Sequence, residues 1–265
     1  MIVPKNNDFI TPEGLADFWP RILDARHRLL GLDYDGTLAP FAVEPMQARP
    51  LEGVIELLQD LARNRGTIPV VISGRPAAEV AILLARPPVT IIGSHGFEHW
   101  PVGGKLETRQ PSPLQKQGLN RARSSASRSG HGYRLEEKVA SLALHTRHLP
   151  EETANAVESE IADAWGKLAR QHDLECRRFN GGMEIRCADW HKGKALAMLL
   201  ARQPAETLAV YIGDDDTDED AFAILQGRGL GIRVGGSLTS TAAAGFLPDC
   251  RAVVELLRAW KSQVA

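Results

Sequence analysis

Five short apolar segments constrain the fold of this chain more than any other feature. They cover residues 28–34, 68–72, 89–93, 208–212 and 230–234. Runs of this length, bounded by glycine or polar residues, are typical of strands buried on both faces. Stretches with helical periodicity lie between several of them, and this alternation predicts a parallel, doubly wound α/β sheet with right-handed crossovers. In such a sheet the carboxyl ends of the strands lie along one edge, where ligands bind.

Two carboxylates follow the first of these segments directly, in the sequence Asp33-Tyr34-Asp35-Gly36-Thr37. Two carboxylates at the end of a buried strand are costly unless a cation joins them. Oxygen ligands without clustered His or Cys favour Mg²⁺ over zinc. A carboxylate in such a place can also act as a nucleophile. The alternative is an acidic turn, because Asp and Gly are common in turns.

The other predicted strands bring further polar groups to the same edge. Residues 73–75 and 94–98 follow the second and third strands, and residues 214–220 contain five aspartates and one glutamate after the fourth. A serine hydroxyl, backbone amides and one lysine, here Lys192, suit a phosphate group. A carboxylate nucleophile, a hard cation and a receptor for phosphate at one site together indicate phosphoryl transfer through an aspartyl-phosphate.

The middle of the chain differs from the flanking parts in amino-acid composition. Residues 101–132 are rich in Gly, Ser, Arg and Gln, and they predict a linker followed by a weakly amphipathic helix near 113–127. The basic stretch from Arg121 to Arg128 matches no motif. A second helix with an apolar stripe is predicted after Pro150.

Short alternating strands complete this middle region. Gly181-Gly182 separates residues 174–180 from 183–187, which is a strong signal for a two-residue hairpin. In that register Cys176 lies opposite Cys187. We therefore expect a smaller α/β domain of residues 103–188, inserted into a core domain formed by residues 1–102 and 189–265.

Amino-acid composition limits the classes of protein to which this chain can belong. Of the 265 residues 43% are hydrophobic and 24% charged, which is ordinary for a globular protein, and the net charge of −2 gives no global attraction to nucleic acid or an anionic membrane. No apolar run approaches ~18 residues, and no signal peptide is visible. Three cysteines without a paired pattern fit a reducing compartment, so we expect a cytoplasmic protein with no thiolate zinc site.

The motifs also resemble those of a known family. D-x-D-G-T, a strand-end Ser, Lys-Gly and G-D-D resemble the haloacid dehalogenase superfamily of phosphatases. The longer segments resemble the trehalose-6-phosphate phosphatase family within it, namely residues 33–38, 73–75, 94–98, 144–147, 182–186 and 213–222. The resemblance covers roughly residues 25–260. It implies a haloacid dehalogenase-like core with a mobile cap, Mg²⁺ as cofactor, and hydrolysis of trehalose 6-phosphate to trehalose and phosphate.

The resemblance also implies roles for single residues. Asp33 corresponds to the nucleophile, and Asp35 to the general acid that protonates the departing sugar oxygen and then activates water. The implied catalytic residues are Asp33, Asp35, Ser73 and Lys192. The implied Mg²⁺ ligands are Asp33, Asp35, Asp214 and Asp215. The implied substrate-binding residues are Ser73, Gly74, Arg75, His95, Glu98, Lys138, His145, Arg147, Glu184, Arg186 and Asp218.

Several alternatives stay open at the level of the sequence. The substrate could be sucrose phosphate or a hexose phosphate, the reaction could be that of a phosphomutase, or the chain could be an inactive sugar-phosphate sensor. Both aspartates of the first motif speak against a sensor, since a binder needs no nucleophile. Ser73 could cap the helix that Pro76 begins, and Asp218 could serve only a helix N-terminus. We expect a monomer without nucleic-acid or membrane partners, functionally coupled to a trehalose-6-phosphate synthase.

Overall fold

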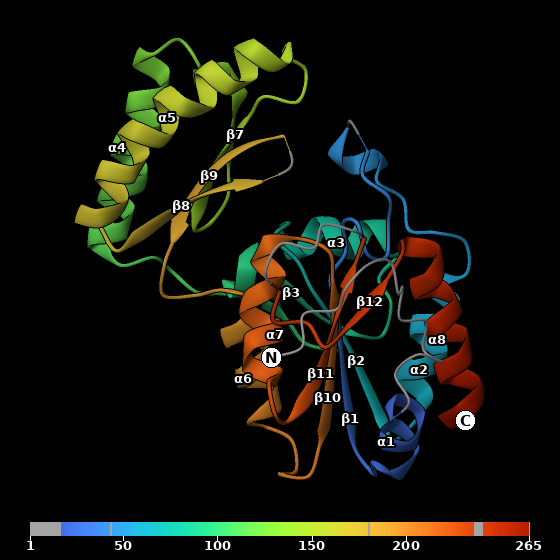
Figure 1. Ribbon diagram of the computed structural model, residues 1–265. Helices are drawn as coiled ribbons and strands as arrows, with labels where there is room; N and C mark the ends of the chain where they lie inside the picture. Colours follow the sequence, from blue (N-terminus) through green and yellow to red (C-terminus); the bar gives the residue numbers. More distant parts are fainter. Residues whose placement is uncertain (1–16, 43, 180, 236–240, 265) are drawn as a thin grey trace. The chain divides into compact units, whose positions relative to one another are not determined.

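The computed structural model describes residues 17–42, 44–179, 181–235 and 241–264 (Figure 1). Two compact units make up the chain. The core unit consists of Met1–Glu107 and Lys192–Ala265, and the inserted unit consists of Thr108–His191. The boundaries expected from composition, after residues 102 and 188, lie a few residues before each of these junctions.

An eight-stranded sheet organises the core unit, in the order β12-β11-β10-β1-β2-β3-β4-β5. Its parallel strands are β1 (Arg28–Leu32), β2 (Thr67–Ile72), β3 (Thr90–Gly93), β10 (Leu208–Gly213), β11 (Gly229–Val234) and β12 (Gly245–Leu247). The strands β4 (Glu98–Trp100) and β5 (Glu107–Thr108) extend the sheet beyond β3, and β4 runs antiparallel to β3. All five predicted strands are therefore confirmed.

The chain order of the strands reverses beside β1. From β1 the chain proceeds through β2 and β3 on one side, and it returns with β10 on the other. Ligands of open α/β sheets bind at such a switch point, outside the carboxyl ends of the strands. Leu32, the last residue of β1, pairs with Ile212 and Val71, and each of these lies one residue before the end of its own strand. Asp33 therefore emerges beside the ends of both neighbouring strands.

Helices cover both faces of this sheet (Figure 1). They are α1 (Phe18–Asp24), α2 (Val54–Arg63), α3 (Ala77–Leu83), α6 (Lys192–Leu200), α7 (Glu219–Leu225) and α8 (Cys250–Val264), with short 3₁₀ turns η2 (Pro45–Gln47), η3 (Ser94–Gly96) and η5 (Asp216–Asp218). One apolar core includes residues of α2 and α8, and a second on the other face includes residues of α6 and α7. Because both faces are covered, β1 is buried along its whole length. The doubly wound fold is confirmed.

The inserted unit has its own antiparallel sheet, in the order β6-β7-β9-β8. The strands are β6 (Leu135–Glu137), β7 (Ser141–His145), β8 (Leu174–Phe179) and β9 (Gly182–Cys187), and η4 (Gly132–Arg134) precedes them. The helices α4 (Pro113–Arg128) and α5 (Glu151–Gln171) cover one face of it (Figure 1). Trp165 of α5 is fully buried and donates its indole N–H to the carbonyl of Ala122, 3.1 Å away.

The predicted register of the last hairpin is wrong. Phe179 pairs with Gly182, which makes Gly182 part of β9, and Cys176 lies opposite Ile185 instead of Cys187. A Cβ atom on Gly182 would come within 2.0 Å of the carbonyl oxygen of Leu144. Gly182 is thus needed for close approach to the neighbouring strand and not for the turn. The shift moves the pairing by two residues, so every side chain of β9 keeps its face.

No described helix is both long and apolar enough to span a membrane.

Candidate active site

A buried lysine lies at the centre of the carboxyl edge of the core sheet. Lys192 is the first residue of α6, and its Nζ lies 2.9 Å from Oδ1 of Asp33 and 2.8 Å from Oδ1 of Asp218. Burial alone would lower the pKa of Lys192, but the charges of Asp218 and Asp33 raise it above its ordinary value. A cation at a helix N-terminus is electrostatically unfavourable. The two carboxylates therefore keep Lys192 charged despite its burial at a helix N-terminus.

Asp218 is held from three directions and has no exposed surface. It accepts hydrogen bonds from Lys192, from the hydroxyl of Tyr211 at 2.6 Å and from the backbone N–H of Asp215 at 2.9 Å. A Cβ atom on Gly213 would lie 2.3 Å from its Cγ, so this position must be glycine. Asp218, expected as a substrate-binding residue, lies against Lys192 in the structure. Tyr211 was missed, because nothing local marks an apolar-strand tyrosine as a hydrogen-bond donor.

The acidic cluster fits a hard cation. Ligand oxygens of Asp33, Asp214 and Asp218 all lie within 4.8 Å of one another, and Oδ1 of Asp214 is buried with no hydrogen-bond partner. Such an orphaned carboxylate oxygen is unfavourable unless a cation approaches it. Burial, reinforced by Asp218, raises the pKa of Asp214 to about 8. Burial and Asp218 also raise the pKa of Asp33, and Lys192 opposes this in part. A purely oxygen donor set is the one that Mg²⁺ prefers.

Gly36 allows this cluster to form. It has a left-handed backbone with φ +68°, and a Cβ atom there would lie 2.0 Å from Oδ2 of Asp214. Asp215, expected as a further ligand, accepts the N–H of Asp216 at 2.8 Å in the turn that precedes α7. Burial raises the pKa of Asp215. The geometry thus brings Asp33 and Asp214 together and gives Asp215 a local capping contact.

Asp35 is bound by an arginine from the loop that follows β2. Its two carboxylate oxygens accept hydrogen bonds from Nε and Nη2 of Arg75, at 2.6 and 2.7 Å. Arg75 also donates to the carbonyl of Pro45 at 2.8 Å, and its guanidinium lies over the ring of Tyr34, 5.7 Å from the centroid. Arg75, expected as a substrate-binding residue, thus contacts the carboxylate predicted to be the general acid. Only the pairing of β1 with β2 brings these side chains together.

The residues that follow β2 and β3 form a tight corner. Oγ of Ser73 accepts the N–H of Arg75 at 3.1 Å, so Ser73 does not cap α3, whose N-cap is Pro76. His95 has a left-handed backbone with φ +56°, and its ring occupies the space that a Cβ on Gly74 would need.

Buried Glu98 holds the same corner together. Its Oε2 accepts hydrogen bonds from the N–H of Ala77 and the hydroxyl of Ser94, both at 2.9 Å. Ser94 also has a left-handed backbone, with φ +49°. Consecutive left-handed residues other than glycine are uncommon, and they cluster at functional sites. Glu98 ties this strained turn to the N-terminus of α3.

The predicted residues of the inserted unit share one polar face of its sheet. Glu184 accepts a hydrogen bond from Ser141 at 2.8 Å and pairs with Lys138 at 3.5 Å. His145 lies 2.8 Å from a carboxylate oxygen of Glu136. The register pairs Glu136 with Ala143 and Ala143 with Glu184, which puts these side chains on the same face.

The two predicted arginines of this unit have different surroundings. Arg186 donates to Glu175 of the neighbouring strand at 2.5 Å, and the register places these two residues opposite each other. Arg147 packs beside Gly181, where an added Cβ would lie 2.9 Å from its Nε. Glu136, Ser141 and Glu175 were missed, although strand alternation in a correct register would have found them.

Proteins of known function resemble this chain. A maize (Zea mays) trehalose 6-phosphate phosphatase is 31% identical over 93% of this chain and 74% of its own length. A bifunctional trehalose-6-phosphate synthase/phosphatase of Thermoproteus tenax is 32% identical over 88% of this chain, which spans only 32% of that relative.

Solved structures agree on the fold. The C-terminal domain of Candida albicans trehalose-6-phosphate phosphatase has a TM-score of 0.81 at 22% identity, over 97% of this chain and 99% of that one. A phosphatase of the haloalkanoate (HAD) superfamily from Bacteroides thetaiotaomicron has a TM-score of 0.61 at 19% identity, over 91% and 97% of the two chains. A family model described as trehalose-phosphatase matches residues 31–242. Because that match covers most of the sequence, the chain belongs to the trehalose-phosphatase family.

Proposed function

We propose that this protein is a Mg²⁺-dependent phosphatase that hydrolyses trehalose 6-phosphate to trehalose and inorganic phosphate. Membership of the family supports the reaction and the substrate. The observation that carries the mechanism is the buried Lys192, held between Asp33 and Asp218 beside the unpartnered oxygen of Asp214. This arrangement offers a nucleophile, a cation for the phosphate and a site for a metal ion.

Asp33 and Asp214 would hold Mg²⁺ through their carboxylates, with the main-chain carbonyl of Asp35 as a further ligand. The bound ion would supply positive charge to the transferring phosphoryl group. Its positive charge would also offset the burial and the charge of Asp218, which raise the pKa values of Asp33 and Asp214. Asp218 has its oxygens engaged by Lys192, Tyr211 and the turn, so we assign it to positioning and not to the metal.

Catalysis proceeds in two displacements. A carboxylate oxygen of Asp33 attacks phosphorus, an O–P bond forms, and the bond from phosphorus to the sugar oxygen breaks as Asp35 donates a proton to that oxygen. Water then attacks the aspartyl-phosphate, Asp35 accepts a proton from it, and phosphate leaves with Asp33 regenerated. Lys192 and the hydroxyl of Ser73 bind the phosphate oxygens in both steps. Arg75 orients the Asp35 carboxylate by donating a hydrogen bond to each of its two oxygens.

The polar face of the inserted sheet is the proposed sugar site. Glu184, Lys138 and His145 offer charged and neutral groups of the kind that bind sugar hydroxyls, and each is oriented by a neighbour on the same face. A phosphatase for sucrose phosphate or a hexose phosphate would use the same core but a different polar face.

The proposal also covers the functional partner, the oligomeric state and the location of the protein. A relative in which a synthase and a phosphatase are fused in one chain supports functional coupling to a trehalose-6-phosphate synthase. We also propose a monomer that acts in the cytoplasm.

The test is phosphate release from trehalose 6-phosphate, sucrose 6-phosphate, glucose 6-phosphate and p-nitrophenyl phosphate, each with Mg²⁺ and with chelator. We expect Mg²⁺-dependent release with strong preference for trehalose 6-phosphate. The control is Asp33→Asn, nearly isosteric, which should fold normally and release no phosphate. Turnover by this variant near the wild-type rate would exclude Asp33 as nucleophile. Equal rates on all sugar phosphates would exclude the proposed sugar site.

A further inference from the structure

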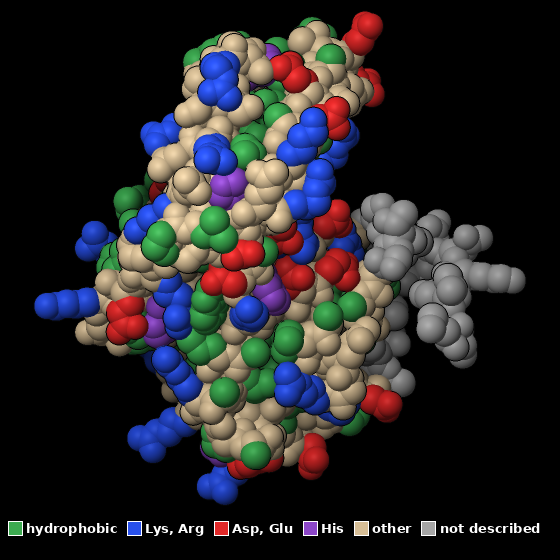
Figure 2. Space-filling view, turned by 90° about the vertical axis from the view of Figure 1, so that its left-hand side faces the viewer, with side chains coloured by type: hydrophobic (Ala, Val, Ile, Leu, Met, Phe, Trp, Pro, Cys, Tyr) green, Lys and Arg blue, Asp and Glu red, His purple; other side chains and the backbone are tan. Residues whose placement is uncertain are grey.

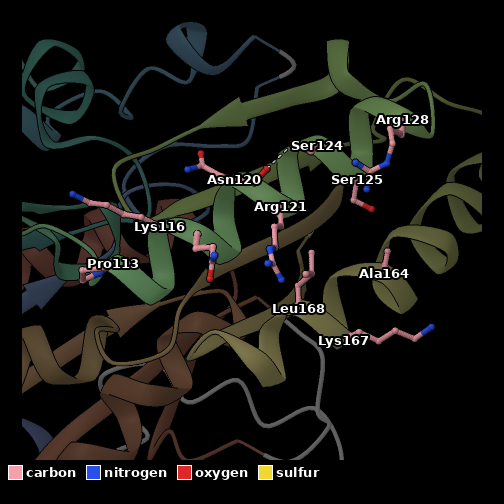
Figure 3. Close-up of a pocket in the computed structure, with 11 residues that line it drawn as sticks. Pro113, Lys116, Asn120, Arg121, Ser124, Ser125, Arg128, Ala164, Lys167 and Leu168 are labelled. Atoms are coloured by element: carbon pink, nitrogen blue, oxygen red, sulfur yellow. Dashed lines mark hydrogen bonds between the residues drawn. The ribbon is translucent and has the colours of Figure 1, made fainter.

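A basic groove lies between the two helices of the inserted unit and is not used by the proposed reaction. This α4–α5 groove has a volume of about 860 Å³ and is lined by Lys116, Asn120, Arg121 and Arg128 of α4 and by Lys167 and Leu168 of α5, among others (Figure 3). Its lining includes four cationic side chains and no carboxylate. The whole chain has a net charge of −2, so this concentration of positive charge is local.

None of the four cations has an acidic partner among the described residues. Within the described ranges, no carboxylate lies at ion-pair distance from Arg121, Arg128 or Lys167. Arg123, on the same helix but outside the groove, does pair with Glu137 at 3.2 Å. Lys116 contacts only the neutral amide oxygen of Gln110, at 3.1 Å. Like charges gathered in one groove repel each other, and an anionic ligand would relieve this repulsion.

The charges are distributed along the groove and do not converge on one point. Lys116 and Arg128 are separated by about 18 Å along α4, at 1.5 Å per residue, and Arg121 lies between them (Figure 3). Lys167 reaches the groove from α5. In Figure 2, which looks onto the side of Figure 1 where α4 and α5 lie, basic side chains are spaced over the part of the view that the inserted unit occupies. A single phosphate could contact only part of this row, whereas an extended polyanion could follow it.

The groove lining favours a peptide over a nucleic acid or a membrane. No aromatic residue lines it, although proteins that bind single-stranded nucleic acid commonly stack bases on aromatic rings. Ala164 and Leu168 instead provide a small apolar floor for aliphatic stems, and Asn120 and Ser124 can hydrogen-bond a peptide backbone. A concave surface also suits a narrow chain better than a flat bilayer.

We propose that the α4–α5 groove binds an extended acidic segment of a partner protein. In an extended chain every second side chain points the same way, at intervals of about 6.6 Å. About six residues of such a chain would span the row from Lys116 to Arg128 and place three carboxylates along it. The site is separate from the polar face of the inserted sheet, so binding does not require the phosphatase reaction.

The test uses the full chain and a fluorescein-labelled peptide of alternating Glu and Ser, twelve residues long, with a Gln-Ser peptide as the uncharged match. Fluorescence anisotropy should show salt-sensitive binding of the Glu-Ser peptide only. The triple variant Arg121→Gln, Arg128→Gln, Lys167→Gln should lose at least about tenfold in affinity, since three ion pairs are removed. The control variant Arg26→Gln, Arg65→Gln, Arg202→Gln removes the same charge from exposed positions of the core unit and should stay within about twofold of wild type.

Equal losses in the two triple variants would mean that only net charge matters, and they would overturn the proposal. Undetectable peptide binding at 50 mM salt would do the same. Tighter binding of a twelve-nucleotide uridine oligomer, or of vesicles containing phosphatidylserine, lost in the groove variant, would assign the groove to nucleic acid or membrane instead. Anisotropy needs no turnover, so failure of the proposed phosphatase activity would not affect this result. Unchanged melting temperatures of both variants would verify that they fold.

Discussion

Tyr211 provides a sharp test of how the active site is supported. Its hydroxyl is fully buried and donates to the carboxylate of Asp218, which in turn holds Lys192. A hydrogen bond to a charged group contributes about 1.5–3 kcal/mol to stability, against about 0.5–1.5 kcal/mol for a neutral pair. Tyr211→Phe should therefore lower the free energy of unfolding by about 2 kcal/mol. Because Asp218 would then hold Lys192 less firmly, kcat should also fall by about tenfold.

Tyr34→Phe is the matched control. Tyr34 is equally buried, but its hydroxyl donates to the neutral carbonyl of Ala48, at 2.5 Å. Burial and Asp218 raise the pKa of Tyr211, so its hydroxyl remains a donor and the loss in Tyr211→Phe should be constant from about pH 6 to pH 9. Urea unfolding and steady-state kinetics would measure both effects. A stability loss no larger than that of Tyr34→Phe, with unchanged kcat, would refute the supporting role.

Three further predictions follow from the same geometry. Gly36→Ala should raise the Mg²⁺ concentration needed for half-maximal activity, because the added Cβ would displace Asp214. The control is Gly103→Ala, which should leave this concentration unchanged. Gly103 has a similar φ of +69°, but no atom lies within 4 Å of a Cβ added there. Mg²⁺ should raise the melting temperature more at pH 9 than at pH 6, since the Asp214 carboxyl, whose pKa is about 8, must lose its proton to bind the ion. An equal rise in melting temperature at both pH values would contradict this prediction. Glu184→Ala should weaken trehalose 6-phosphate turnover far more than p-nitrophenyl phosphate turnover, and equal losses would mean that Glu184 makes no sugar contact.

Local pattern was sufficient for most of the strands and helices of both units. An apolar run that ends in polar residues needs no knowledge of distant parts of the chain, and β1, β2, β3, β10 and β11 were all predicted in this way. The same holds for α4, whose capping box joins Ser112 and Gln115 within its first turn. The strands that were missed, β4, β5 and β12, have two or three residues each, too few for a periodic pattern to stand out.

The sequence alone also determined which residues gather at the carboxyl edge of the core sheet, because parallel strands must bring their ends together. It could not determine what each carboxylate does there. Asp35 and Arg75, Asp218 and Tyr211, and Gly36 and Asp214 meet through contacts between different strands and turns. The register of β9 likewise depended on the close approach of Gly182 to Leu144, which is a property of the packed sheet. Side-chain direction and burial are set by neighbours that lie far away in the sequence, and for that reason only the tertiary structure decided them.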